Sequence, residues 1–140
     1  MSKDSLELLK EVPLFSTFSD KQLKSVKKTA KEKQFGPGDE IVREGDASNA
    51  GFYLILDGQV EVKQDENTLS KLGSGQFFGE MAVLDEKPRS ADVVATTETR
   101  CLLLTSWDFK ALLKTYPDMA TNVIEELANR LRQTNMALSK

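Results

Sequence analysis

The 140-residue sequence predicts a mainly β fold with helices at both ends. Seven glycines punctuate the stretch from Phe35 to Gly75, and the runs between them are short. One run, VEV at 60–62, alternates apolar with polar residues, as a half-buried strand does. Both ends of the chain instead space their apolar residues at the helical period. Many short strands separated by turn residues favour an antiparallel sandwich or barrel.

The composition is that of a single globular domain. Hydrophobic residues make up 39% of the chain and charged residues 29%, and 140 residues can bury one sizeable core. The formal net charge is −3, which disfavours non-specific attraction to nucleic acid. We therefore expect one domain over 1–140 and no direct contact with nucleic acid.

Several kinds of chemistry are disfavoured by what the sequence lacks. The chain has no histidine, which removes the commonest acid/base group and the commonest metal ligand. We expect neither an enzyme nor a metal site, because no nucleophile–base pair or metal-ligand cluster is evident. One cysteine and an N-terminus without a signal-peptide pattern predict a reducing cytoplasm. No apolar run is long enough to cross a bilayer, so we expect no membrane insertion.

Residues 1–33 are expected to hold the N-terminal helices. The second helix should begin near Ser19 or Asp20, with Leu23 and Val26 on one face. This segment contains six lysines without an arginine or an interleaved aromatic residue: Lys21, Lys24, Lys27, Lys28, Lys31 and Lys33. That pattern favours a solvated helix face over a phosphate-contacting surface.

The strands are expected in 34–105 and two further helices in 106–140. The last strand, RCLLLT at 100–105, carries Cys101, for which a buried and inert thiol is predicted. Thr105 or Ser106 can cap the next helix, and Pro117 can begin a final helix that continues almost to Lys140.

Apolar residues in the final helix follow a heptad spacing, interrupted by one threonine. The positions are Ala120, Ile124, Leu127, Leu131, Thr134 and Leu138. A helix packed on its own domain and a homodimer through this C-terminal helix explain the spacing equally well.

The stretch FGEMAVLDEKPRSA at 78–91 interrupts the strands and carries the most distinctive chemistry. A short helix beginning after Gly79 would present backbone N–H groups that suit an anion. Glu80 would repel a phosphate, so its better partner is a neutral hydroxyl such as that of ribose. Arg89 offers a fork of donors that matches two phosphate oxygens, and Ser90 adds a hydroxyl. Spacing alone is weak evidence, because such a pair is usually two surface residues.

This stretch resembles the phosphate-binding cassette of the cyclic nucleotide-binding domain family. The pattern Phe-Gly-Glu, small or apolar residues, Leu, a loop, then Pro-Arg, a hydroxyl residue and Ala is matched in step over 78–91. Similarity extends to FGPGDEIVREGD at 35–46 and GFYLILDGQVEV at 51–62, and covers essentially all of the chain. The resemblance implies a jelly-roll-like antiparallel β-barrel with a short phosphate-binding helix.

The resemblance also implies roles for individual residues. Glu80 would bond the ribose 2′-hydroxyl, and Arg89 would hold the exocyclic oxygens of the cyclic phosphate. The other implied ligand-binding residues are Gly79, Met81, Ala82, Ser90 and Ala91 around the phosphate, Val62 and Leu69 against the purine, and Thr134 and Asn135 at the purine edge. Asp92 stands where the family often has Thr or an apolar residue, and an inward-pointing acid there would weaken binding.

The function implied is that of a sensor which binds cyclic AMP, or alternatively cyclic GMP, and signals through movement of its C-terminal helices. The similarity is to catabolite activator-type regulators and to cyclic nucleotide-gated channels, and the effector protein is unknown. The regulators continue into a helix-turn-helix domain where this sequence ends at Lys140. Two alternatives are a protein-interaction domain that binds no nucleotide and the sensor part of a DNA-binding transcription regulator.

Overall fold

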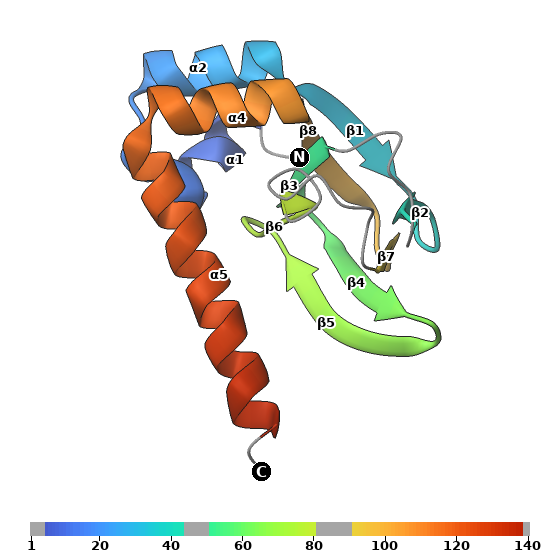
Figure 1. Ribbon diagram of the computed structural model, residues 1–140. Helices are drawn as coiled ribbons and strands as arrows, with labels where there is room; N and C mark the ends of the chain where they lie inside the picture. The colour runs from blue at the N-terminus through green and yellow to red at the C-terminus, as the bar shows by residue number, and fades with distance from the viewer. Residues whose placement is uncertain (1–4, 44–50, 81–90, 139–140) are drawn as a thin grey trace.

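The computed structural model describes residues 5–43, 51–80 and 91–138, and its helices lie before and after the strands (Figure 1). The helices before the strands are α1 (Ser5–Lys10), the 3-10 helix η1 (Pro13–Phe15) and α2 (Asp20–Thr29), and those after them are α4 (Ser106–Thr115) and α5 (Pro117–Leu138). The strands are β1 (Lys31–Phe35), β2 (Glu40–Val42), β3 (Gly51–Asp57), β4 (Gln59–Gln64), β5 (Asn67–Gly73), β6 (Phe77–Phe78), β7 (Asp92–Ala95) and β8 (Thr99–Thr105).

The described strands form two four-stranded sheets in which every pair is antiparallel. One sheet has the order β1-β8-β3-β6 and the other the order β2-β7-β4-β5. The prediction of a mainly β, antiparallel, jelly-roll-like fold with flanking helices is confirmed. Within the described residues the strands make two facing sheets rather than one closed barrel.

Strand β3 explains how the layers are held together. Its first six residues are all buried. Alternate side chains point to opposite faces of a sheet, and each face of this strand packs on a core cluster. Phe52 on one face joins the larger core cluster, where its ring stacks on Phe109 of α4 at 4.2 Å between centroids. Tyr53 on the other face joins the smaller cluster, which includes Val60 of β4 and Val93 of β7. The sheet that contains β3 therefore lies between the helices and the second sheet.

Local hydrogen bonds set the helix starts that the sequence predicts. Ser19 caps α2 in a reciprocal capping box with Gln22, and the Thr105 side chain accepts a hydrogen bond from the Asp108 backbone N–H at the start of α4. The first strand begins at Lys31, inside the range 1–33 expected to hold only helices. It is a strand because Lys31–Phe35 pairs in register with Leu103–Thr99, a partnership that no local pattern reveals.

Cys101 is buried in β8, as the sequence predicts. The residue is fully inaccessible to solvent, and burial raises the pKa of its thiol to about 12. A thiol that stays protonated at neutral pH is a poor nucleophile, which supports the expected inert structural role. Among the described helices, none combines the length and apolar character that crossing a membrane requires.

Candidate functional site

The described part of the FGE motif sits where β6 ends. Phe77 and Phe78 pair with Leu54 and Tyr53 of β3, and both rings are buried. Gly79 then adopts a φ of 89°, a left-handed conformation that a residue with a Cβ rarely adopts. This turn directs the chain from the sheet into the helical residue Glu80.

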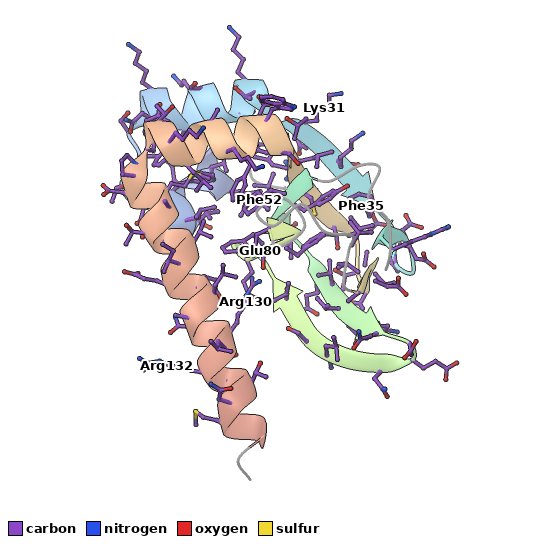
Figure 2. The ribbon with its side chains drawn as sticks, viewed as in Figure 1. Lys31, Phe35, Phe52, Glu80, Arg130 and Arg132 are labelled. Carbon is purple, nitrogen blue, oxygen red and sulfur yellow. The ribbon has the colours of Figure 1, made fainter. Side chains whose placement is uncertain are left out.

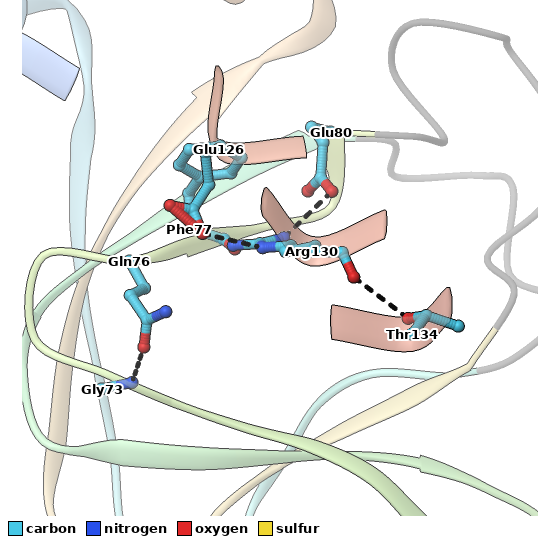
Figure 3. Close-up of polar contacts among 7 residues, drawn as sticks. All are labelled: Gly73, Gln76, Phe77, Glu80, Glu126, Arg130 and Thr134. Atoms are coloured by element: carbon cyan, nitrogen blue, oxygen red, sulfur yellow. Dashed lines mark hydrogen bonds and ion pairs between the residues drawn. The ribbon is translucent and has the colours of Figure 1, made fainter. Parts of the chain in front are cut away.

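Glu80 is a buried carboxylate in contact with the last helix. Only 6% of its side chain is exposed, and its Oε1 accepts a hydrogen bond from Nη1 of Arg130 at 3.2 Å (Figure 3). Burying a carboxylate is costly unless it is paired, so this contact stabilises the position of Glu80. The ion pair joins residues fifty positions apart and ties α5 to the start of the cassette.

Arg130 has three further contacts that hold it in place. Its Nη2 donates to the Phe77 carbonyl oxygen at 2.6 Å, its Nε donates to Glu126 Oε1 at 3.3 Å, and its guanidinium carbon lies 4.7 Å from the centroid of the Phe77 ring. The guanidinium therefore lies between two carboxylates and over an aromatic face, all of which favour its positive charge.

Arg130 is a residue of the candidate site that the sequence pattern does not indicate. Figure 2 shows Arg130 on the side of α5 that faces the strands and Arg132 on the opposite side. Arg132 is exposed, whereas the Arg130 side chain is 26% exposed. The sequence contains a weak signal, an acid four residues before Arg130 at Glu126, but that spacing alone does not indicate a partner on another element.

The polar residues predicted at the purine edge lie one helical turn beyond Arg130. Thr134 is exposed, and its Oγ1 donates to the Arg130 carbonyl oxygen at 3.1 Å. Asn135 follows it and is also exposed. Thr134 therefore lies one helical turn from the arginine that contacts Glu80.

The predicted apolar wall lies on the second sheet. Val62 of β4 is half-buried and packs against the smaller core cluster, opposite Val93 of β7. Leu69 lies on the neighbouring β5, where the register shifts beside Val62, and is 57% exposed. Ala91, which is 8% exposed, leads into β7. Val62, Leu69 and Ala91 are thus carried by three adjacent strands or their ends.

The remaining predicted site residues are Met81, Ala82, Arg89 and Ser90, and they lie outside the described residues. Asp92, the departure from the family pattern, is half-buried and lies opposite Lys63 of β4 in the ladder. Across the described ranges there is no group of three or more His, Cys, Asp or Glu side chains that could hold a metal ion.

Comparison with known proteins shows which proteins the chain is similar to. Residues 32–116 match the family model described as cyclic nucleotide-binding domain. The chain is 34% identical over 135 residues to the cyclic AMP receptor protein of Thermus thermophilus, covering 93% of this chain and 62% of that protein. It is 33% identical over 105 residues to a cAMP-dependent protein kinase regulatory subunit of Hypocrea atroviridis, covering 75% of this chain and 22% of that protein.

The solved structures agree at the level of the fold. The crystal structure of the Thermus thermophilus catabolite activator protein superimposes with a TM-score of 0.78 at 33% identity, covering 91% of this chain and 62% of that one. The chain therefore spans less than two thirds of the length of these relatives.

Proposed function

The chain belongs to the cyclic nucleotide-binding domain family, and from this premise we propose that it is a sensor module that binds cyclic AMP. The observation that carries the proposal is Glu80, a buried carboxylate at the start of the cassette, in contact with the last helix. A buried acid beside a stretch that ends in Pro-Arg-Ser-Ala suits a ligand carrying both hydroxyls and a phosphate.

In this proposal each part of the ligand has its own group of residues. The Glu80 carboxylate accepts a hydrogen bond from the ribose 2′-hydroxyl, and Arg89 binds the cyclic phosphate. Val62 and Leu69 contact the purine, which would cover the exposed surface of Leu69. The remaining contacts come from Gly79, Met81, Ala82, Ser90 and Ala91 at the phosphate and from Thr134 and Asn135 at the base edge.

The proposed signal runs through α5. Arg130 on α5 contacts the same carboxylate that the proposal assigns to ribose. A ligand that contacts Glu80 must therefore change the environment of Arg130, and movement of α5 must change the affinity of Glu80 for the ligand. Such reciprocity is what couples a binding site to a distant output.

We propose cyclic AMP rather than cyclic GMP as the ligand, because the names of the two relatives described above contain cyclic AMP. We propose binding without turnover, since a chain that lacks histidine offers no evident acid/base machinery.

We further propose that Ile124 and Leu131, which are 65% and 61% exposed on α5, pair with the same helix of a second copy. The effector is an unidentified protein or a further domain, and the compartment is the cytoplasm.

Calorimetric titration and thermal unfolding with cyclic AMP, cyclic GMP and 5′-AMP test this function. Cyclic AMP at about 100 times its Kd should raise the free energy of unfolding by about 2.7 kcal/mol, whereas 5′-AMP should leave it unchanged. Arg89→Ala should weaken binding by roughly 2 to 5 kcal/mol, which corresponds to about thirty-fold to several thousand-fold in affinity.

Arg43→Ala is the matched control, because Arg43 forms an exposed ion pair with Glu40. This variant should bind cyclic AMP with unchanged affinity. A loss of less than about threefold on Arg89→Ala would contradict the role of Arg89. Well-folded protein that responds to neither cyclic nucleotide would instead support the protein-interaction alternative.

A further inference from the structure

The two helices α2 and α4 lie on the side of the first sheet that faces away from the second sheet, and both pack on the larger core cluster. At one end, the ring of Phe18, just before α2, lies 4.6 Å from the ring of Tyr116, just after α4. At the other end, Lys31 pairs with Leu103, close to where α2 ends and α4 begins. The helices, of ten residues each, therefore run antiparallel beside each other (Figure 1).

Both helices bury one face in the same core cluster and turn the other face outward. Leu23 and Val26 of α2 and Phe109 of α4 belong to the larger cluster. The residues on the opposite faces, together with the first residue of β1, are exposed, and we call them the α2–α4 surface: Lys21, Lys24, Lys28, Lys31, Trp107 and Lys114.

Trp107 is the second feature that distinguishes this surface. It is 87% exposed, more than any other large hydrophobic residue described, and it is the one tryptophan of the chain. It lies in the first turn of α4, at the end of the helix pair where Lys31 begins β1 (Figure 2 labels Lys31). An exposed tryptophan among lysines combines apolar area with positive charge.

The nearby acids do not neutralise this charge. Asp20 lies 3.5 Å from Lys10, and Glu32 is hydrogen-bonded to Arg100. Asp108 is half-buried in the first turn of α4, where the helix dipole favours an acid. The surface is therefore basic although the whole chain has a net charge of −3.

The composition indicates which kind of partner fits. Protein–protein interfaces are enriched in arginine and depleted in lysine, whereas this surface has five lysines and no arginine. Lysine clusters attract anionic lipid headgroups, and tryptophan prefers the membrane–water interface. The acidic remainder of the protein does not oppose this, because charge effects fall off within about 8 Å at physiological ionic strength. We propose that the α2–α4 surface docks on an anionic membrane surface, with Trp107 in the headgroup region.

Co-sedimentation with vesicles tests the proposal, and Trp107 supplies an internal fluorescence signal. The full chain is mixed, without nucleotide, with phosphatidylcholine vesicles or with the same vesicles containing phosphatidylserine. We expect binding and a blue shift of tryptophan emission only with phosphatidylserine, both reversed by added salt. Lys24→Gln combined with Lys28→Gln should weaken this binding by about thirty-fold.

The matched control, Lys63→Gln with Lys71→Gln, neutralises two lysines on the strands. It should bind the vesicles as tightly as the wild-type protein does. Thermal unfolding verifies that both double variants are folded. Absence of binding, equal binding to phosphatidylcholine alone, or an equal loss in the control would overturn the proposal. So would a blue shift with poly-glutamate but not with vesicles, which would identify an acidic polypeptide as the partner. The test uses no cyclic nucleotide, so its result is independent of the proposed sensor function.

Discussion

At the scale of single residues, Arg130 is the side chain that joins the last helix to the candidate site. It joins Glu80, Glu126 and the Phe77 carbonyl oxygen, and it comes from a helix at the opposite end of the sequence. Removing one partner of a buried ion pair is far more costly than removing a surface charge, because the remaining charge stays buried. The structure therefore predicts different outcomes for two arginines that look equivalent in the sequence.

Arg130→Ala should lower the free energy of unfolding by about 2 to 4 kcal/mol, since it removes a cation that contacts the buried Glu80 carboxylate. Urea denaturation measures this change. Arg132→Ala, two positions on and exposed, is the control and should change stability by less than about 0.5 kcal/mol. Equal effects of the two substitutions would show that the Arg130 contacts contribute little.

The ion pair between Glu32 and Arg100 predicts that the stability of the fold depends on pH. Its hydrogen bonds from Arg100 hold the pKa of the carboxyl below its ordinary value of 4.5, with a further hydrogen bond from Ser5. A pKa lowered by folding means that ionised Glu32 stabilises the folded protein above about pH 4.5, and that this stability is lost as pH falls through the folded pKa.

At neutral pH the Glu32→Gln variant should therefore have a lower free energy of unfolding than the wild-type protein, and this difference in free energy should shrink in acid. Urea denaturation at a series of pH values checks the trend. In the Arg100→Gln background the same change should have little pH-dependent effect, because the main cause of the lowered pKa is gone. A difference that grew as the pH fell would reverse the assigned sign.

At the scale of elements, the turn between β3 and β4 matters because it carries the chain from one sheet to the other. Gly58 adopts a φ of 109°, and a Cβ there would lie 2.5 Å from the Glu98 carbonyl oxygen and 2.7 Å from the Thr99 Cα. Both are backbone atoms that cannot move aside. Thr99 also donates to the Gln59 carbonyl oxygen at 3.2 Å, so the turn is held against the start of β8.

Gly58→Ala should lower the free energy of unfolding by about 3 kcal/mol or more, through both the clash and the left-handed backbone. Gly38→Ala is the control, because Gly38 has a φ of 89° but nothing within 4 Å of the added Cβ. It should cost only about 1 to 2 kcal/mol for the backbone conformation. Chemical denaturation of both variants separates the two contributions.

At the scale of the whole molecule, α5 has one face packed on the domain and another face with exposed apolar residues. Met119 and Val123 are buried in the larger cluster, and Leu127 packs against it. Ile124 and Leu131 are exposed. Of the heptad positions, Leu127 therefore packs on the domain, whereas Ile124 and Leu131 are exposed on another face of the helix.

If α5 pairs with a second copy, Ile124→Glu with Leu131→Glu should convert dimer to monomer, because charges would face each other in an apolar seam. Sedimentation velocity, with and without cyclic AMP, measures this. Asn129→Glu with Gln133→Glu introduces the same charges at exposed positions elsewhere on the helix and should leave the assembly unchanged. A protein that is already monomeric at high concentration would contradict the homodimer.

The features that the sequence alone determined are local ones. Capping at Ser19 and Thr105, the glycine-punctuated strands and the cassette motif each depend on residues a few positions apart, so their physical cause is contained in a short window. Tertiary structure alone decided that Lys31 begins a strand, that α2 and α4 share a surface, and that Arg130 contacts Glu80. Each of these contacts joins residues far apart in the chain, and the energy that favours them exists only once the two sheets and the helices have packed together.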